Sequence, residues 1–153
     1  MKKLLLAALL FSSANLFAQK KSNDIAKLST ETFDFGKVKQ NTPPTATITV
    51  TNIGSEPLII EQATPSCGCT VSDYTKAPIA PGKTGTITAT YNAAALGPIN
   101  KTLTVKFAGA DDPKFVKLTG EVLTPDAYAT YESAHPSAKK DKKESKGGSS
   151  SKS

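Results

Sequence analysis

The chain has 153 residues, of which 38% are hydrophobic, and its 19 basic and 13 acidic side chains give a formal net charge of +6. Residues 28–125 hold eight lysines and eight acids, so the positive excess belongs to the two ends of the chain. Every basic residue is lysine, and the absence of arginine, the side chain that reads guanine and phosphate bidentately, argues against specific nucleic-acid recognition.

Residues 1–18 have the layout of a secretory signal peptide. Two lysines precede an apolar run at residues 4–11, and the small residue Ala18 stands before the expected cut. The run is too short to span a bilayer, and no later stretch approaches the length of a membrane helix. We therefore expect a periplasmic or secreted protein, with no transmembrane segment in the mature chain, in which residues 19–27 form a linker.

Residues 28–125 form the expected domain, and their apolar side chains alternate with a period of two. Bulky residues alternate with threonine or lysine in each segment, and glycine, proline and asparagine separate the segments. The predicted strands are 32–35, 46–51, 58–61, 71–74, 87–91, 103–107 and 115–122. This pattern predicts an all-β fold, an immunoglobulin-like two-sheet antiparallel β-sandwich of about seven strands, with a small closed barrel as the alternative.

Residues 126–153 are rich in lysine, serine and glycine and poor in large apolar residues. Such a composition buries too little apolar surface to offset the entropy of ordering, so we expect a disordered tail. Its lysines would contribute about 1 kcal/mol each near an anionic membrane, which permits only weak electrostatic surface contact.

Four short motifs occur in order along the domain. They are FDFGKV at 33–38, TNIGSEPL at 51–58, PSCGCT at 65–70 and IAPG at 79–82. Together they resemble the domain of unknown function 1573 family. The resemblance implies an exported bacterial protein with an immunoglobulin-like sandwich, similar in outline to major-sperm-protein and hydin type binding domains, and it implies no specific activity.

Cys67 and Cys69 are the two cysteines, and they are a possible disulfide or redox pair. In an extended strand their Cα atoms would lie about 6.6 Å apart, near the upper limit for a disulfide, so we expect Gly68 to take a positive φ and shorten that distance. A bridge over one residue removes little unfolded-state entropy, which favours an easily reduced redox couple over a structural staple. Plain packing of two small apolar side chains is the remaining structural interpretation.

Metal and catalytic sites have little support. Two thiolates supply half of a zinc site, and the single histidine, His135, lies in the tail, so zinc is not expected, while copper(I) would accept two sulfur ligands. The same position of His135 leaves no base for a serine or cysteine nucleophile. Asp111 and Asp112 are typical of a solvated turn. We expect no enzyme activity and no cofactor.

The sequence thus predicts a non-enzymatic exported module that binds another protein, as an accessory part of a periplasmic or cell-envelope assembly. The partner is an unidentified envelope or periplasmic protein and not a nucleic acid. Threonines on alternate positions of 47–51 and 86–90 are either a solvated sheet face or a surface that receives a partner strand. The alternative function is a thiol redox or copper(I)-handling protein that uses the Cys-Gly-Cys pair.

Overall fold

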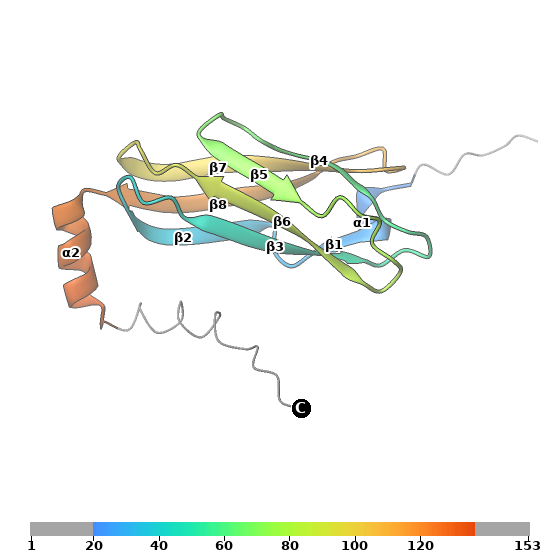
Figure 1. The fold of residues 1–153 in the computed structure, drawn as a ribbon, viewed down its shortest axis with the longest axis horizontal. Coiled ribbons are helices and arrows are strands. Elements are labelled where there is room, and N and C mark those ends of the chain that lie inside the picture. Colours follow the sequence, from blue (N-terminus) through green and yellow to red (C-terminus); the bar gives the residue numbers. More distant parts are fainter. Residues whose placement is uncertain (1–19, 137–153) are drawn as a thin grey trace, which may run out of the picture.

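The computed structural model describes residues 20–136, which form two β-sheets packed face to face, with a helix at one end of the sandwich (Figure 1). The sheets have four strands each, in the orders β1-β3-β6-β5 and β2-β8-β7-β4. The elements are α1 (Ser22–Ile25), β1 (Ala26–Leu28), β2 (Thr32–Lys39), β3 (Thr45–Asn52), β4 (Ile60–Pro65), β5 (Thr70–Tyr74), β6 (Thr84–Tyr91), β7 (Gly97–Phe107), β8 (Lys114–Leu123) and α2 (Pro125–Ala134).

These two separate sheets confirm the predicted all-β sandwich and rule out the closed barrel. Each of the seven predicted strands overlaps one of β2 to β8, and β1 is an eighth strand. The pairing is not wholly antiparallel, because β2 runs parallel to β8, with Phe33 opposite Leu118. Two parallel strands need a long connection, and here the strands from β3 to β7 lie between β2 and β8 in the chain.

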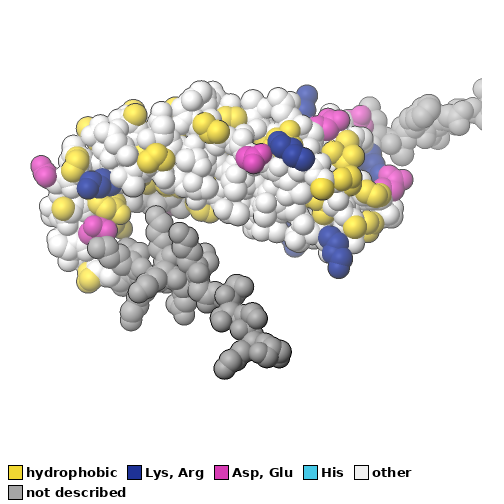
Figure 2. All heavy atoms as spheres, viewed as in Figure 1, with side chains coloured by type: hydrophobic (Ala, Val, Ile, Leu, Met, Phe, Trp, Pro, Cys, Tyr) yellow, Lys and Arg dark blue, Asp and Glu magenta, His cyan; other side chains and the backbone are white. Residues whose placement is uncertain are grey.

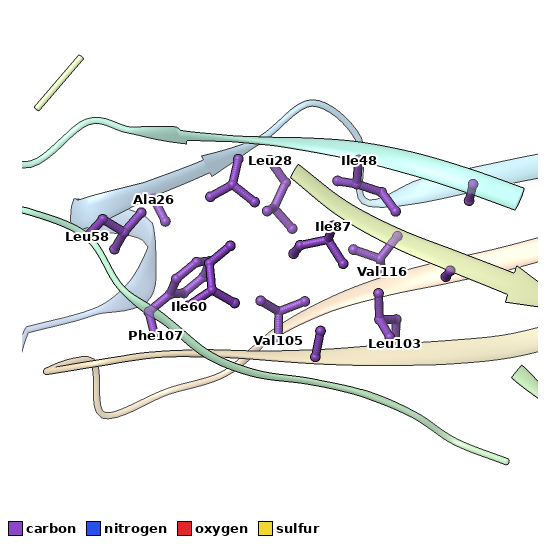
Figure 3. Close-up of a cluster of buried hydrophobic side chains, with 14 of the residues drawn as sticks. Ala26, Leu28, Ile48, Leu58, Ile60, Ile87, Leu103, Val105, Phe107 and Val116 are labelled. Atoms are coloured by element: carbon purple, nitrogen blue, oxygen red, sulfur yellow. The ribbon is translucent and has the colours of Figure 1, made fainter. Parts of the chain in front are cut away.

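The core lies between the sheets and follows from the period-two pattern. Alternate residues point inward, so that Ile48 faces Ile87 across β3 and β6, and Leu103 faces Val116 across β7 and β8. All four are fully buried, and Phe107 closes the same cluster with 1% of its surface exposed (Figure 3). Burial of this apolar surface, worth roughly 25 cal/mol per Å², is the main force that holds the sheets together.

The structure corrects the expected linker at residues 19–27, because most of it belongs to the domain. Ala26 and Leu28 on β1 are buried in the core. Ser22 is 1% exposed, and its backbone N–H and hydroxyl donate to the carboxylate of Asp112 at 2.7 and 3.1 Å. The polar composition of residues 19–27 predicted a linker, but pairing with β3 and the two hydrogen bonds to Asp112 attach this segment to the domain.

Acid is expected to loosen this N-terminal attachment. The hydrogen bond from the backbone N–H of Ser22 outweighs the opposing effect of desolvation and, with the weaker hydrogen bond from the Ser22 hydroxyl, holds the pKa of Asp112 below its usual value of 3.8. Because the folded-state pKa is the lower one, the stabilisation is present above pH 3.8 and is lost as pH falls through the folded-state value. A pH titration of the Ser22 amide by NMR should therefore show an acid transition, which Asp112→Asn removes and the neighbouring Asp111→Asn keeps. An unchanged transition in Asp112→Asn would contradict this assignment.

Helix α2 corrects the disorder predicted for the start of the tail. Thr124 caps the helix by accepting a hydrogen bond from the backbone N–H of Ala127 at 3.3 Å, and Pro125 and Asp126 suit its first turn. The helix buries no residue, which is why composition pointed to disorder. Residues 137–153 of the predicted tail and the predicted signal peptide 1–18 lie outside the described residues.

Neither of the helices within residues 20–136 is both long and apolar enough to cross a membrane.

Candidate functional site

The cysteines lie in the turn that carries the chain from β4 in one sheet to β5 in the other. The backbone N–H of Thr70 donates to the carbonyl of Cys67 at 3.3 Å and closes the turn. The two sulfurs form a disulfide, with 5.3 Å between the Cα atoms. The predicted positive φ of Gly68 is wrong, since this residue is not among those with positive φ. The turn itself folds the chain back and shortens the distance.

The two sulfurs have different surroundings. Cys69 packs against a small hydrophobic cluster at this end of the sandwich, which includes Tyr91 and Ile99. Cys67 belongs to neither hydrophobic cluster of the described residues, and its Sγ lies 3.9 Å from the hydroxyl of the buried Thr70. Both cysteines are partly exposed. Cys69 is therefore anchored to the core, while Cys67 lies on the turn side of the bridge.

Backbone strain occurs close to Cys69. The carbonyl of Cys69 accepts a hydrogen bond from the N–H of Asn92 at 2.9 Å, and the next residue, Ala93, is fully buried with φ of 53°. The carbonyl of Ala93 in turn accepts from the N–H of Asn41, whose φ is 58°. Such left-handed positions in residues other than glycine cost about 1 kcal/mol or more and cluster at functional sites.

Lys101 has an unusual position on β7. It pairs with the fully buried Leu118, so its side chain starts from the inner face of the sheet, and it is only half-buried. The β4–β7 register, with Pro65 opposite Leu103, continues one step because the N–H of Ser66 donates to the carbonyl of Thr102 at 2.8 Å. Cys67 and Lys101 are the chain neighbours of this hydrogen-bonded pair, just beyond the end of β4. Sequence reasoning missed this residue, although a lysine between two inward-facing apolar positions was a visible signal.

The edge of β4 is closed by side chains from β5. Both strands lie at the edges of their sheets, on the same side of the sandwich. The hydroxyl of Ser72 donates to the carbonyl of Ala63 at 2.5 Å, and the hydroxyl of Tyr74 donates to the carbonyl of Glu61 at 2.6 Å. Two carbonyls of an edge strand are thereby satisfied, which hinders another chain from pairing with β4. The Glu61 side chain itself is exposed.

The other predicted candidates lie apart from the cysteine turn. His135 follows α2, where its ring stacks on Tyr131 at 4.5 Å and its Nδ1 lies 3.0 Å from the Tyr131 carbonyl. Asp112 holds Ser22, as described above. Within residues 20–136, no three histidine, cysteine or acidic side chains gather in a way that could hold a metal ion.

Threonines of β3 and β6 form two facing rows on the outer face of the first sheet. The opposed pairs are Thr45 and Thr90, Thr47 and Thr88, Thr49 and Thr86, and Thr51 and Thr84. All of them are exposed or half-buried. Threonine is β-branched and carries a hydroxyl group, so a row of threonines is typical of a sheet face that is exposed to water.

An apolar surface lies at the opposite end from the cysteine turn, near α1 (Figure 2). There the buried Leu58 and Ile79 form a two-residue bridge between loops, with hydrogen bonds of 2.9 and 2.8 Å. The residues on either side of Leu58 and Ile79 in the sequence point outward and are exposed. We call the surface that they form the loop-end surface: Pro57, Ile59, Pro78 and Ala80.

Asn52 holds the two loops behind the loop-end surface together. It is 0% exposed, and its Nδ2 donates to the carbonyls of Glu56 and Ile79, both at 2.7 Å. Its Oδ1 accepts from the N–H of Gly54 at 2.9 Å, and its own N–H donates to the carbonyl of Lys83 at 2.9 Å. A single buried amide thus cross-links both loops, so the loop-end surface is pre-organised.

Solved structures share this fold at low sequence identity. A protein of unknown function from Porphyromonas gingivalis W83 matches with a TM-score of 0.56 and 16% identity, over 63% of this chain and 46% of that one. The secreted serine protease VesC from Vibrio cholerae matches with a TM-score of 0.53 and 13% identity, over 74% of this chain and 26% of the protease. PapD-like domain 7 of human CEP192 matches with a TM-score of 0.53 and 10% identity, over 81% and 97% of the two chains.

The chain therefore spans less than half the length of the first two structures, and the three likenesses show the fold alone. No curated protein sequence matches the chain. A family model matches residues 26–122, which is nearly the whole sandwich and well over half of the chain, and this match confirms the resemblance seen in the sequence motifs. The chain therefore belongs to the family described as protein of unknown function, DUF1573.

Proposed function

We propose that this protein is an exported, non-enzymatic module that binds another protein, as an accessory part of a periplasmic or cell-envelope assembly. The loop-end surface carries the proposal. Exposed apolar residues that lie next to each other and are held by buried hydrogen bonds are typical of protein-binding surfaces. Asn52 fixes the loops before binding, so little conformational entropy is lost when a partner docks.

Two further observations support this function. One solved structure with this fold is a PapD-like domain, which is compatible with a binding role. The signal-peptide pattern at residues 1–18 supports a location outside the cytoplasm for such a module. The partner we expect is an envelope protein with an apolar contact surface.

Ile59→Glu should weaken partner binding about tenfold or more. Ile59 is 40% exposed on the loop-end surface, and a buried interfacial carboxylate without a partner costs at least ~1.4 kcal/mol. The measurement is quantitative pull-down of the mature protein from the envelope of its own source, followed by titration of the recovered partner against purified variants.

Val71→Glu is the matched control. Val71 is also aliphatic and is 72% exposed, but it lies on β5, next to the cysteine turn. Both variants should fold, as judged by thermal unfolding, because neither side chain is in the core. Retained affinity in Ile59→Glu, or an equal loss in Val71→Glu, would contradict binding through the loop-end surface.

A further inference from the structure

We propose that the Cys67–Cys69 disulfide is a thiol–disulfide exchange site that reacts with protein thiols through Cys67, and that Lys101 stabilises the Cys67 thiolate. This activity goes beyond partner binding. It involves the opposite end of the sandwich from the loop-end surface and a different set of residues.

The disulfide contributes little to the stability of the fold. It encloses a single residue, whereas the 2–4 kcal/mol typical of disulfides comes from closing much longer loops. The turn is also held without it, by the Thr70 N–H to Cys67 carbonyl bond and by two hydrogen bonds between Ser66 and Thr102 at 2.8 and 3.1 Å. A bond that the fold does not need is free to break and re-form.

The geometry selects Cys67 as the sulfur that forms the mixed disulfide. Cys69 packs against the hydrophobic cluster, which blocks approach from that side. Cys67 belongs to neither hydrophobic cluster of the described residues, and the adjacent Gly68 is exposed, with no atom other than those of its chain neighbours within 4 Å of the place where a side chain would begin. An incoming thiol can therefore approach the turn from solvent.

Lys101 supplies the charge that such a site needs. The hydrogen bond from the Ser66 N–H to the Thr102 carbonyl at 2.8 Å brings their chain neighbours, Cys67 and Lys101, to the same part of the turn, and a lysine side chain is long enough to reach across it. Lys101 is a half-buried residue whose side chain starts from an inward-facing position, and burying a charge is costly unless it meets a charge of opposite sign. A neighbouring lysine favours the thiolate over the thiol, and the hydroxyl of Thr70, 3.9 Å from Sγ, adds a donor.

The exchange consumes two thiols of a partner. A partner thiolate attacks Sγ of Cys67, the Cys67–Cys69 bond breaks, and its electron pair goes to Sγ of Cys69, which takes a proton from water. A second partner thiol, deprotonated by solvent, attacks the partner sulfur of the mixed disulfide and releases Cys67 as a thiolate. The partner gains a disulfide, and the protein gains two reduced cysteines, so electrons balance. The reverse sequence reduces a partner disulfide.

The test uses reduced and oxidised glutathione as the probe, with thiol state read by alkylation and intact mass. The wild-type disulfide should be reduced by millimolar reduced glutathione, and a trapped adduct should map to Cys67. Lys101→Gln should lower the equilibrium constant for reduction about tenfold, which corresponds to a thiol pKa about one unit higher. Lys106→Gln, on the same strand but exposed on the outer face opposite Gln62, is the matched control and should have no effect.

A pH profile separates electrostatics from structure. In the Cys69→Ser variant, the rate of Cys67 alkylation should rise with a midpoint about one unit lower than in Cys69→Ser with Lys101→Gln. If Cys69→Ser does not fold, the same profile is taken on the reduced wild type with residue-resolved mass mapping. A disulfide that resists glutathione, a midpoint insensitive to Lys101→Gln, or a loss of stability of several kcal/mol in Cys67→Ser with Cys69→Ser would overturn the proposal.

Discussion

Replacing Asn52 by alanine is expected to lower the free energy of unfolding by about 3 kcal/mol. The substitution removes three side-chain hydrogen bonds inside the protein, so the carbonyl of Glu56 and the N–H of Gly54 lose the partner that Asn52 supplies, and the carbonyl of Ile79 loses one of its two donors. Each buried polar group left unsatisfied costs roughly 1–3 kcal/mol, and total stability is only about 5–15 kcal/mol for a domain of this kind. Urea denaturation followed by circular dichroism measures the difference.

Asn100→Ala is the matched control for this experiment. Asn100 lies on β7 and is exposed, so its removal should change stability by no more than about 0.5 kcal/mol. Asn52→Ala should also weaken partner binding through the loop-end surface, because the loops lose their cross-link. Equal stability of the two variants would show that the Asn52 network does not hold the loops.

Gly120→Ala is expected to destabilise the second sheet by about 3 kcal/mol. Gly120 has φ of 150°, a conformation that residues with side chains rarely adopt, and an added Cβ would lie 2.9 Å from the carbonyl oxygen of Gly36. The opposing atom belongs to the backbone of the bulge in β2 between Asp34 and Lys37, so it cannot move aside cheaply. Strain at such a position costs roughly 1–3 kcal/mol, and the clash adds to it.

Thermal and urea unfolding of Gly120→Ala should be compared with those of Gly68→Ala. Gly68 has no positive φ and open space around its Cα, so its replacement should be nearly neutral for stability. A neutral Gly120→Ala would mean that β2 can shift along β8, and the parallel register would then be loose.

The period-two pattern was enough to predict seven strands because every second side chain of a strand points into the core and is apolar. Ile48 and Val50 alternate with threonines in β3, and both are fully buried. β1 escaped prediction because three residues carry too little pattern, and only the contact with β3 makes them a strand. The parallel pairing of β2 with β8 also could not be foreseen, since pairing between distant segments is decided by packing in three dimensions.

The sequence prediction differed from the structure at the start of α2, at Gly68 and at Lys101. Thr124 followed by Pro125 and Asp126 is a recognisable helix start, but the polar composition of the segment outweighed it and led to the prediction of disorder. Cys67 and Cys69 were identified as a pair from sequence, and the structure joins them, yet the turn does so without a positive φ at Gly68. The position of Lys101 depends on the β4–β7 register, which the sequence alone does not give.

The placement of β8 has a consequence for biosynthesis. This strand lies between β2 and β7 and is the last of the described strands to be synthesised. Its residue Lys117 pairs with Thr32, which lies near the start of the domain. A nascent chain that ends before residue 114 therefore lacks an interior strand of its sheet, and β2 has nothing to pair with. Folding of this sheet is therefore expected to wait until β8 has been synthesised, and until then the unfolded chain can pass through a narrow translocation pore.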